Sequence, residues 1–85
     1  MFNKKYEAHL RSVVIECLNG GRTRKRHLLD EVTRKADRQA LREAKDFRIE
    51  LINLLYQMVE EDAIGCDNYR DIAQMEFYQI YYIKG

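Results

Sequence analysis

Cationic side chains crowd the first half of this 85-residue chain, and their chemistry is that of phosphate binding. Residues 1–48 contain 13 Lys and Arg against 7 Asp and Glu, whereas residues 49–85 contain 2 against 7. The formal net charge of +1 therefore hides a basic half and an acidic half. Clustered Lys and Arg attract the phosphates of nucleic acids, so this polarity predicts a polyanionic partner at one end of the fold.

Two groups of side chains are suited to contacting DNA. Arg48 and Asn53 offer the forked donors that match guanine and adenine edges in the major groove. The candidates for phosphate contacts are Thr23, Arg24, Lys25, Arg34, Lys35, Arg38, Arg42 and Lys45. Arg38, Arg42 and Lys45 recur at i, i+4 and i+7, which predicts that they share one helix face. The alternative for this stripe is a solvated surface whose charges are paired by neighbouring carboxylates.

The spacing of apolar residues predicts two helices that position the first of these side chains. One face of the first helix comprises Phe2, Tyr6, Leu10, Val13, Val14, Cys17 and Leu18. Gly20 and Gly21 are expected to end this helix, because glycine tolerates the left-handed backbone of a helix terminus. Thr23 is the expected N-cap of the second helix, whose apolar positions are Leu28, Leu29, Val32 and Ala36.

From residue 37 to residue 62 the helical periodicity continues, but Arg48 falls within the apolar stripe. Burying that charge without a partner would cost several kcal/mol. We therefore predict a break near residues 45–47, with Asp46 as N-cap and a short extra helix over about residues 38–44. The alternative is one long helix with Arg48 at its rim.

The last third of the chain predicts an antiparallel β-hairpin. Alternating residues at about 64–66 and 77–83 read as two strands, and the polar segment 67–71 reads as the turn between them. At this turn Asn68, Tyr69 and Arg70 are candidates for reaching into a minor groove. Asp67 and Asp71 flank them and would be repelled by phosphate, so a contact with protein is the alternative. The expected fold is a single α+β domain over residues 1–85, a winged helix of three or four helices followed by a C-terminal hairpin.

The segment Leu54-Leu55-Tyr56-Gln57-Met58-Val59-Glu60-Glu61-Asp62-Ala63-Ile64 resembles the end of a winged-helix recognition helix, with Asp62 where glycine is usual. Asn19-Gly20-Gly21-Arg22-Thr23 and Tyr81-Tyr82-Ile83-Lys84-Gly85 resemble the small fimbrial phase-variation regulators of enteric bacteria, the Pap/Fae type. The likeness spans most of the chain if residues 33–44 are allowed as an insertion. This resemblance implies a transcription regulator that acts beside a larger DNA-binding protein.

Catalytic and metal-binding chemistry find little support in the sequence. His9 and His27 have no cysteine or carboxylate at ligand spacing that would define a metal site, and the adjacent acidic residues 60–62 lie on different sides of a helix. Cys17 and Cys66 are 49 residues apart without paired spacing, which favours buried thiols in a reducing compartment. We expect no enzyme activity, no cofactor, no metal and no membrane span, and a cytoplasmic location.

The function expected from these observations is sequence-specific binding of double-stranded DNA by a bacterial, phage or plasmid transcription regulator that forms a homodimer. The alternative is a protein-interaction module, an inhibitor or adaptor on the same scaffold, because four of the six tyrosines lie from Tyr69 onward. Salt would discriminate the two, since binding through phosphates weakens steeply as the salt concentration rises.

Overall fold

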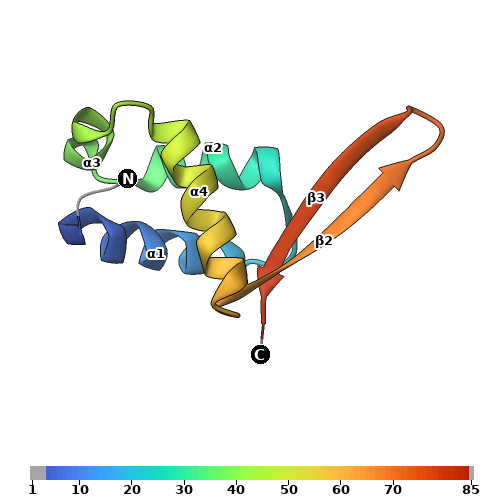
Figure 1. Cartoon of the computed structure of the whole chain (residues 1–85), viewed down its shortest axis with the longest axis horizontal. Coiled ribbons are helices and arrows are strands. Elements are labelled where there is room, and N and C mark those ends of the chain that lie inside the picture. Colours follow the sequence, from blue (N-terminus) through green and yellow to red (C-terminus); the bar gives the residue numbers. More distant parts are fainter. Residues whose placement is uncertain (1–3, 85) are drawn as a thin grey trace.

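Helices occupy the first two thirds of the chain, and an antiparallel hairpin closes it (Figure 1). The computed structural model describes residues 4–84. These residues form helices α1 (Lys4–Leu18), α2 (Lys25–Lys35), α3 (Arg38–Glu43) and α4 (Phe47–Glu60), and strands β1 (Thr23–Arg24), β2 (Ile64–Asp71) and β3 (Glu76–Ile83). The α+β class expected from the sequence is confirmed. Phe2, expected on the first helix, lies outside the described residues.

The core lies where α1, α2 and α4 meet the base of the sheet. Its fully buried side chains include Leu10, Val14, Leu18, Leu28, Val32, Leu51, Leu55, Met58, Ile64 and Tyr81. Every helix of this core contributes residues at three- and four-residue intervals, as the apolar periodicity predicted. Full burial of a side chain such as Leu55 stabilises the fold by about 1.5–3 kcal/mol. Helices α1, α2 and α4 are therefore held by one common core.

The predicted break before Arg48 is confirmed. α3 begins after Asp37, whose carboxylate accepts a hydrogen bond from the backbone N–H of Gln39 at 2.9 Å. α4 begins after Asp46, whose carboxylate accepts from the N–H of Ile49 at 3.2 Å. Each aspartate satisfies a backbone donor that has no partner within the helix. Two helices replace one long helix, and Arg48 is exposed in the first turn of α4.

The start of α2 differs from the prediction. Thr23 does not cap this helix, because Arg24 occupies the N-cap position and the Thr23 hydroxyl donates to the carbonyl of Gly21 at 3.0 Å. Thr23 and Arg24 instead form β1. This strand has only two residues, so no alternation of apolar and polar residues could reveal it in the sequence. Gly21 makes the preceding turn with φ +125°, a region that favours glycine.

The sheet of the described residues has the order β1-β3-β2, with antiparallel pairs throughout. The hairpin was predicted correctly, but its turn was placed wrongly. Residues 67–71, expected to turn, continue β2 and pair with β3, from Asp67 opposite Ile80 to Asp71 opposite Glu76. The turn comprises residues 72–75, where the carboxylate of Asp71 accepts from the N–H of Gln74 at 3.2 Å. The outer half of β2 covers no core, and four of its five residues, Asp67, Asn68, Arg70 and Asp71, are polar, so this segment resembled a turn.

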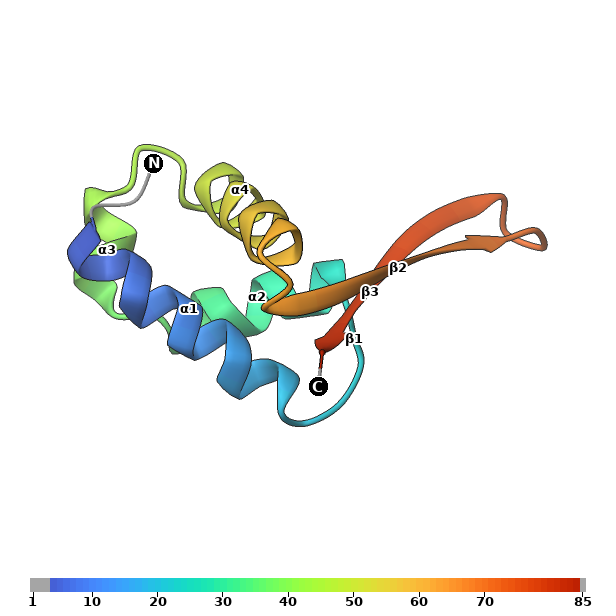
Figure 2. The same ribbon diagram turned by 60° about the horizontal axis from the view of Figure 1, so that its bottom comes forward.

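The hairpin projects from the helical body as an arm, which is clearest when the molecule is turned (Figure 2). The body and the arm together measure 41 × 27 × 21 Å. At the base of the arm, Lys84 forms an ion pair with Asp62 at 2.8 Å across the α4–β2 turn. Asp62 has φ 62°, in the left-handed region that favours glycine. A cleft remains between the arm and the helices.

Candidate nucleic-acid interface

Four cations from three elements line the cleft between the helical body and the hairpin. Arg24 comes from β1, Lys25 and Arg26 from the first turn of α2, and Arg48 from the first turn of α4. The opposite wall is formed by hairpin residues, with Asn68 and Tyr69 from β2 and Glu76, Phe77, Tyr78 and Gln79 from β3. The cavity volume is about 610 Å³. We call this site the basic cleft.

The positive charge of the basic cleft is not neutralised from within. None of its four cations forms an ion pair with a residue in the described part of the chain. Glu76 is the one carboxylate among the lining residues. A concave surface with an excess of unpaired cations concentrates positive potential and attracts anions. The geometry therefore suits a phosphate group or another polyanionic segment.

Aromatic rings hold two of these cations in place. The guanidinium of Arg24 lies over the ring of Tyr78, 4.1 Å from its centroid. The ammonium of Lys25 lies 5.8 Å from the centroid of Tyr56 on α4. Such cation–π contacts stabilise a charge without neutralising it. The N–H groups at the edge of a stacked guanidinium stay available for an anionic ligand.

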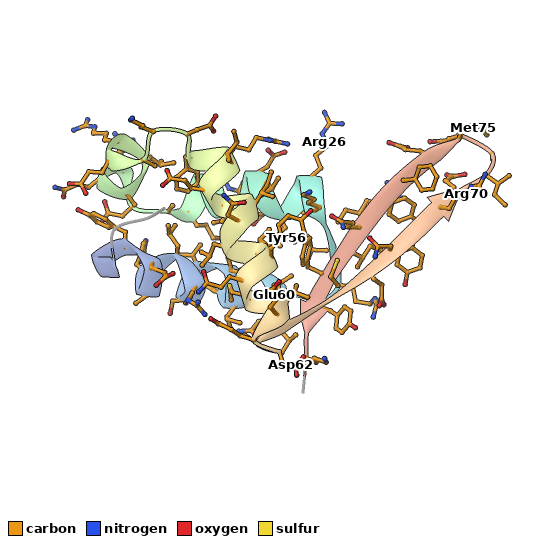
Figure 3. The ribbon with its side chains drawn as sticks, viewed as in Figure 1. Arg26, Tyr56, Glu60, Asp62, Arg70 and Met75 are labelled. Atoms are coloured by element: carbon orange, nitrogen blue, oxygen red, sulfur yellow. The ribbon has the colours of Figure 1, made fainter. Side chains whose placement is uncertain are left out.

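A second group of contacts fixes the hairpin against the loop before β1. Arg22 forms an ion pair with Asp67, donates to the hydroxyl of Tyr69 at 3.0 Å and lies over the ring of Tyr82. The Tyr69 side chain that accepts this hydrogen bond is stacked on Tyr78. The two rings are nearly parallel, and their centroids are 5.4 Å apart. These contacts set the position of the wall that carries Asn68 and Tyr69. Figure 3 shows the side chains of the arm and Arg26 extending from the start of α2.

Five of the residues proposed from the sequence meet at the basic cleft: Arg24, Lys25, Arg48, Asn68 and Tyr69. Thr23 lies beside them in β1, but its hydroxyl bonds the backbone. Asn53 is exposed on α4, outside the lining of the cleft. Asn68, Tyr69 and Arg70 belong to strand β2 and not to a hairpin tip, and Arg70 lies against Phe77, 5.6 Å from the ring centroid.

The remaining proposed cations lie elsewhere. At the far end of α2, Arg34 pairs with Glu31 at 2.6 Å and Lys35 approaches Glu16 at 3.9 Å. Arg38 and Arg42 lie on α3, which ends at Glu43. The expectation that Lys45 shares their helix face is wrong, because Lys45 follows the end of that helix. The i, i+4, i+7 spacing predicts one face only where a helix spans all three positions.

Sequence reasoning missed Arg26 and Arg22. Arg26 follows directly after Arg24 and Lys25, so the run of three cations was a signal that could have included it. Arg22 could not be found in this way, because its partners Asp67, Tyr69 and Tyr82 are more than 40 residues away.

The sequence predicted two buried cysteines, but both are only half-buried. Burial raises the pKa of both the Cys17 and the Cys66 thiol, which keeps them protonated at neutral pH. The exposed ring of His9 accepts a hydrogen bond from the backbone N–H of Asp37 at 3.1 Å. Within residues 4–84 no cluster of three potential metal ligands occurs. No helix of that range is long and apolar enough to cross a bilayer.

Comparison of the chain with protein families, with curated proteins and with solved structures gives no match.

Proposed function

We propose that this chain is a winged-helix transcription regulator that binds double-stranded DNA without a cofactor. The order of elements supports the proposal, because β1 lies between the core helices α1 and α2, and the hairpin of β2 and β3 follows the third core helix, α4. β3 pairs with both β1 and β2, and the hairpin projects as a wing (Figure 2). In such an arrangement α4 takes the place of the recognition helix. The resemblance to small fimbrial regulators supports the same class and adds a larger DNA-binding protein as a partner.

The basic cleft is the observation that carries this proposal. Arg24, Lys25, Arg26 and Arg48 converge there from three elements, and none has a carboxylate partner among residues 4–84. Cations left unpaired on a concave surface favour a polyanion over a neutral ligand. Phosphate contacts of this kind supply the sequence-independent part of DNA affinity.

The proposed complex places one DNA strand in the basic cleft. The first turns of α4 enter the major groove, which is wide enough for a helix. The backbone that borders this groove then passes between α4 and the hairpin. Arg48 and the cations at the start of α2 contact its phosphates, and Asn68 lies on the facing wall. Phosphate contacts fix the register of the protein on the duplex.

Salt-dependent DNA binding tests the proposal. We would measure the affinity of the intact chain for a labelled duplex by fluorescence anisotropy over a range of salt concentrations. The logarithm of affinity should fall linearly with the logarithm of salt, and Arg48→Ala should flatten the slope by roughly 0.9. Thermal stability of this variant should be unchanged, because Arg48 is exposed and forms no ion pair with a described residue.

Arg34→Ala is the matched control, since it removes the same charge from a residue that is paired with Glu31 outside the cleft. Its salt slope should equal that of the parent. Equal effects of the two variants, or an affinity that ignores salt, would contradict the proposal. A destabilised Arg48→Ala protein with undiminished affinity would show instead that Arg48 has a structural role.

A protein-interaction module is the second candidate, and the end of the hairpin favours it. Ile72, Met75 and Phe77 are 73%, 77% and 77% exposed, which is unusual for three large apolar side chains on one short segment. A second copy of the chain is the first partner to test, by sedimentation of the parent and of Ile72→Ser at low and high salt. Association that persists at high salt and is lost in Ile72→Ser would favour this function.

A further inference from the structure

The face of α4 that points away from the core carries an unusual set of residues for a DNA-reading helix. Ile49, Asn53, Tyr56 and Glu60 recur at i, i+4, i+7 and i+11, which places them on one stripe. All four are exposed, and Ile49 and Tyr56 are 56% and 51% exposed. Figure 3 shows Tyr56 and Glu60 on the same side of the helix. We call these four residues the outward stripe.

No cation belongs to the outward stripe. Arg48 is the one cation in the sequence of α4, and its side chain lines the basic cleft together with Ile52. Asn53 lies five positions after Arg48, so at 100° per residue their directions differ by about 140° around the helix axis. Arginine is the residue that most often reads guanine. In the proposed complex the guanidinium of Arg48 is turned toward the phosphates and away from the base edges.

Asn53 is the polar group of the stripe that is free to read a base. Its amide makes no hydrogen bond with a described residue, whereas the neighbouring Gln57 donates to Glu61 at 3.2 Å. An asparagine amide matches the N6 donor and N7 acceptor of adenine in the major groove. Ile49 and Tyr56 lie one turn to either side of Asn53, where an apolar surface can contact thymine methyl groups.

We infer that the outward stripe makes this chain a reader of consecutive adenine–thymine pairs, with Asn53 bonded to adenine and Ile49 and Tyr56 against thymine methyls. The inference rests on the proposed DNA binding and adds the base preference. Glu60 limits the reading to the first turns of α4, because a carboxylate in the last turn is repelled by the phosphates at the edge of the groove. The stripe adjoins the basic cleft at Tyr56, whose ring centroid lies 5.8 Å from the ammonium of Lys25.

Selection from a library of duplexes with a randomised centre tests this inference on the intact chain. The enriched sequences should contain adjacent A·T pairs. Replacing their thymines by uracil removes only the methyl groups and should weaken binding about fourfold per contacted methyl, as expected for one buried methyl group. Replacing the contacted adenine by 7-deazaadenine removes the N7 acceptor and should weaken binding about fivefold or more.

Variants assign each effect to a residue. Ile49→Ala should bind the thymine duplex and the uracil duplex with equal affinity. Asn53→Ala should bind the adenine duplex and the 7-deazaadenine duplex with equal affinity. Both variants should keep the salt slope of the parent. Ser12→Ala is the control, because Ser12 is exposed on α1. It should bind each of these duplexes with the affinity of the parent. Enrichment of G·C pairs, or salt-dependent binding with no enrichment, would overturn the inference and leave the proposed function standing. Absence of salt-dependent binding would overturn both.

Discussion

The ring of Tyr82 lies directly against the backbone of Gly65, its cross-strand partner at the base of the hairpin. A Cβ atom on residue 65 would stand 2.3 Å from Cε2 and Cζ of this ring, closer than any normal contact. The same ring carries the guanidinium of Arg22, 4.6 Å from its centroid. Gly65 therefore allows Tyr82 to lie flat and to support the contacts that position the hairpin.

We expect Gly65→Ala to lower the free energy of unfolding by about 1–3 kcal/mol, the range for overpacking a close contact. Urea denaturation would measure the change. In a Tyr82→Ala background the ring is absent, so the added methyl group should have little effect. Equal losses in the two backgrounds would show that the ring does not cause the strain.

Met75 occupies the last position of the hairpin turn with φ 53°, where a side chain is disfavoured. Met75→Gly should raise the free energy of unfolding by about 1 kcal/mol, because glycine adopts this left-handed conformation without a clash. Ala73→Gly in the same turn is the control, since Ala73 has no positive φ and should only lose stability through added flexibility of the unfolded chain. A destabilised Met75→Gly would mean that the Met75 side chain contributes more than its backbone strain removes.

A pH dependence is expected from the contact that joins α1 to the end of α4. Arg11 forms two hydrogen bonds with the carboxylate of Glu61, at 2.6 and 3.1 Å, and these lower the pKa of Glu61 below its ordinary value. A lowered pKa stabilises the folded state above the ordinary pKa of glutamate, and this contribution is lost as the pH falls through the folded value.

Glu61→Gln should therefore be less stable than the parent at pH 7, and the difference should shrink as the solution is acidified. Thermal melting of both proteins over a series of pH values would measure it. A difference that does not change with pH would show that the contact acts through packing and not through charge.

The arginines of α3 offer a second basic surface, and a pair of double variants separates it from the cleft. Arg26→Glu with Arg48→Glu should abolish DNA binding, whereas Arg38→Glu with Arg42→Glu should weaken it only modestly. The physical reason is screening, since exposed charges beyond about 8 Å interact little at physiological salt. Anisotropy with one duplex would compare the two proteins. The opposite order of effects would move the phosphate-binding surface to α3.

Local signals in the sequence sufficed for the helices and for the N-cap of α4, but not for the start of α2, where Arg24 and not Thr23 occupies the N-cap position. Asp46 could be placed because an N-cap acts within three residues, and Arg48 revealed the break because a charge is excluded from an apolar stripe. Asp37 caps α3 in the same way but was not predicted. The short strand β1 could not be predicted, because Thr23 and Arg24 are held by partners on β3 that are more than 50 residues away. The basic cleft depends on the same long-range pairing, so the sequence predicted several of its residues but not which of them would meet.

The pairing of β1 has a dynamic consequence for the hairpin. β1 contacts β3 only opposite Ile80 and Tyr81, so residues 76–79 of β3 are flanked on one side alone within the described structure. Backbone amides near Tyr81 should exchange with deuterium slowly, at the rate of global unfolding, and those beyond Gln79 should exchange through local opening of the arm. The base of the hairpin would then be rigid where it joins the core, and the distal segment could bend without unfolding the domain. Such a hairpin can adapt its shape to the curvature of a bound partner.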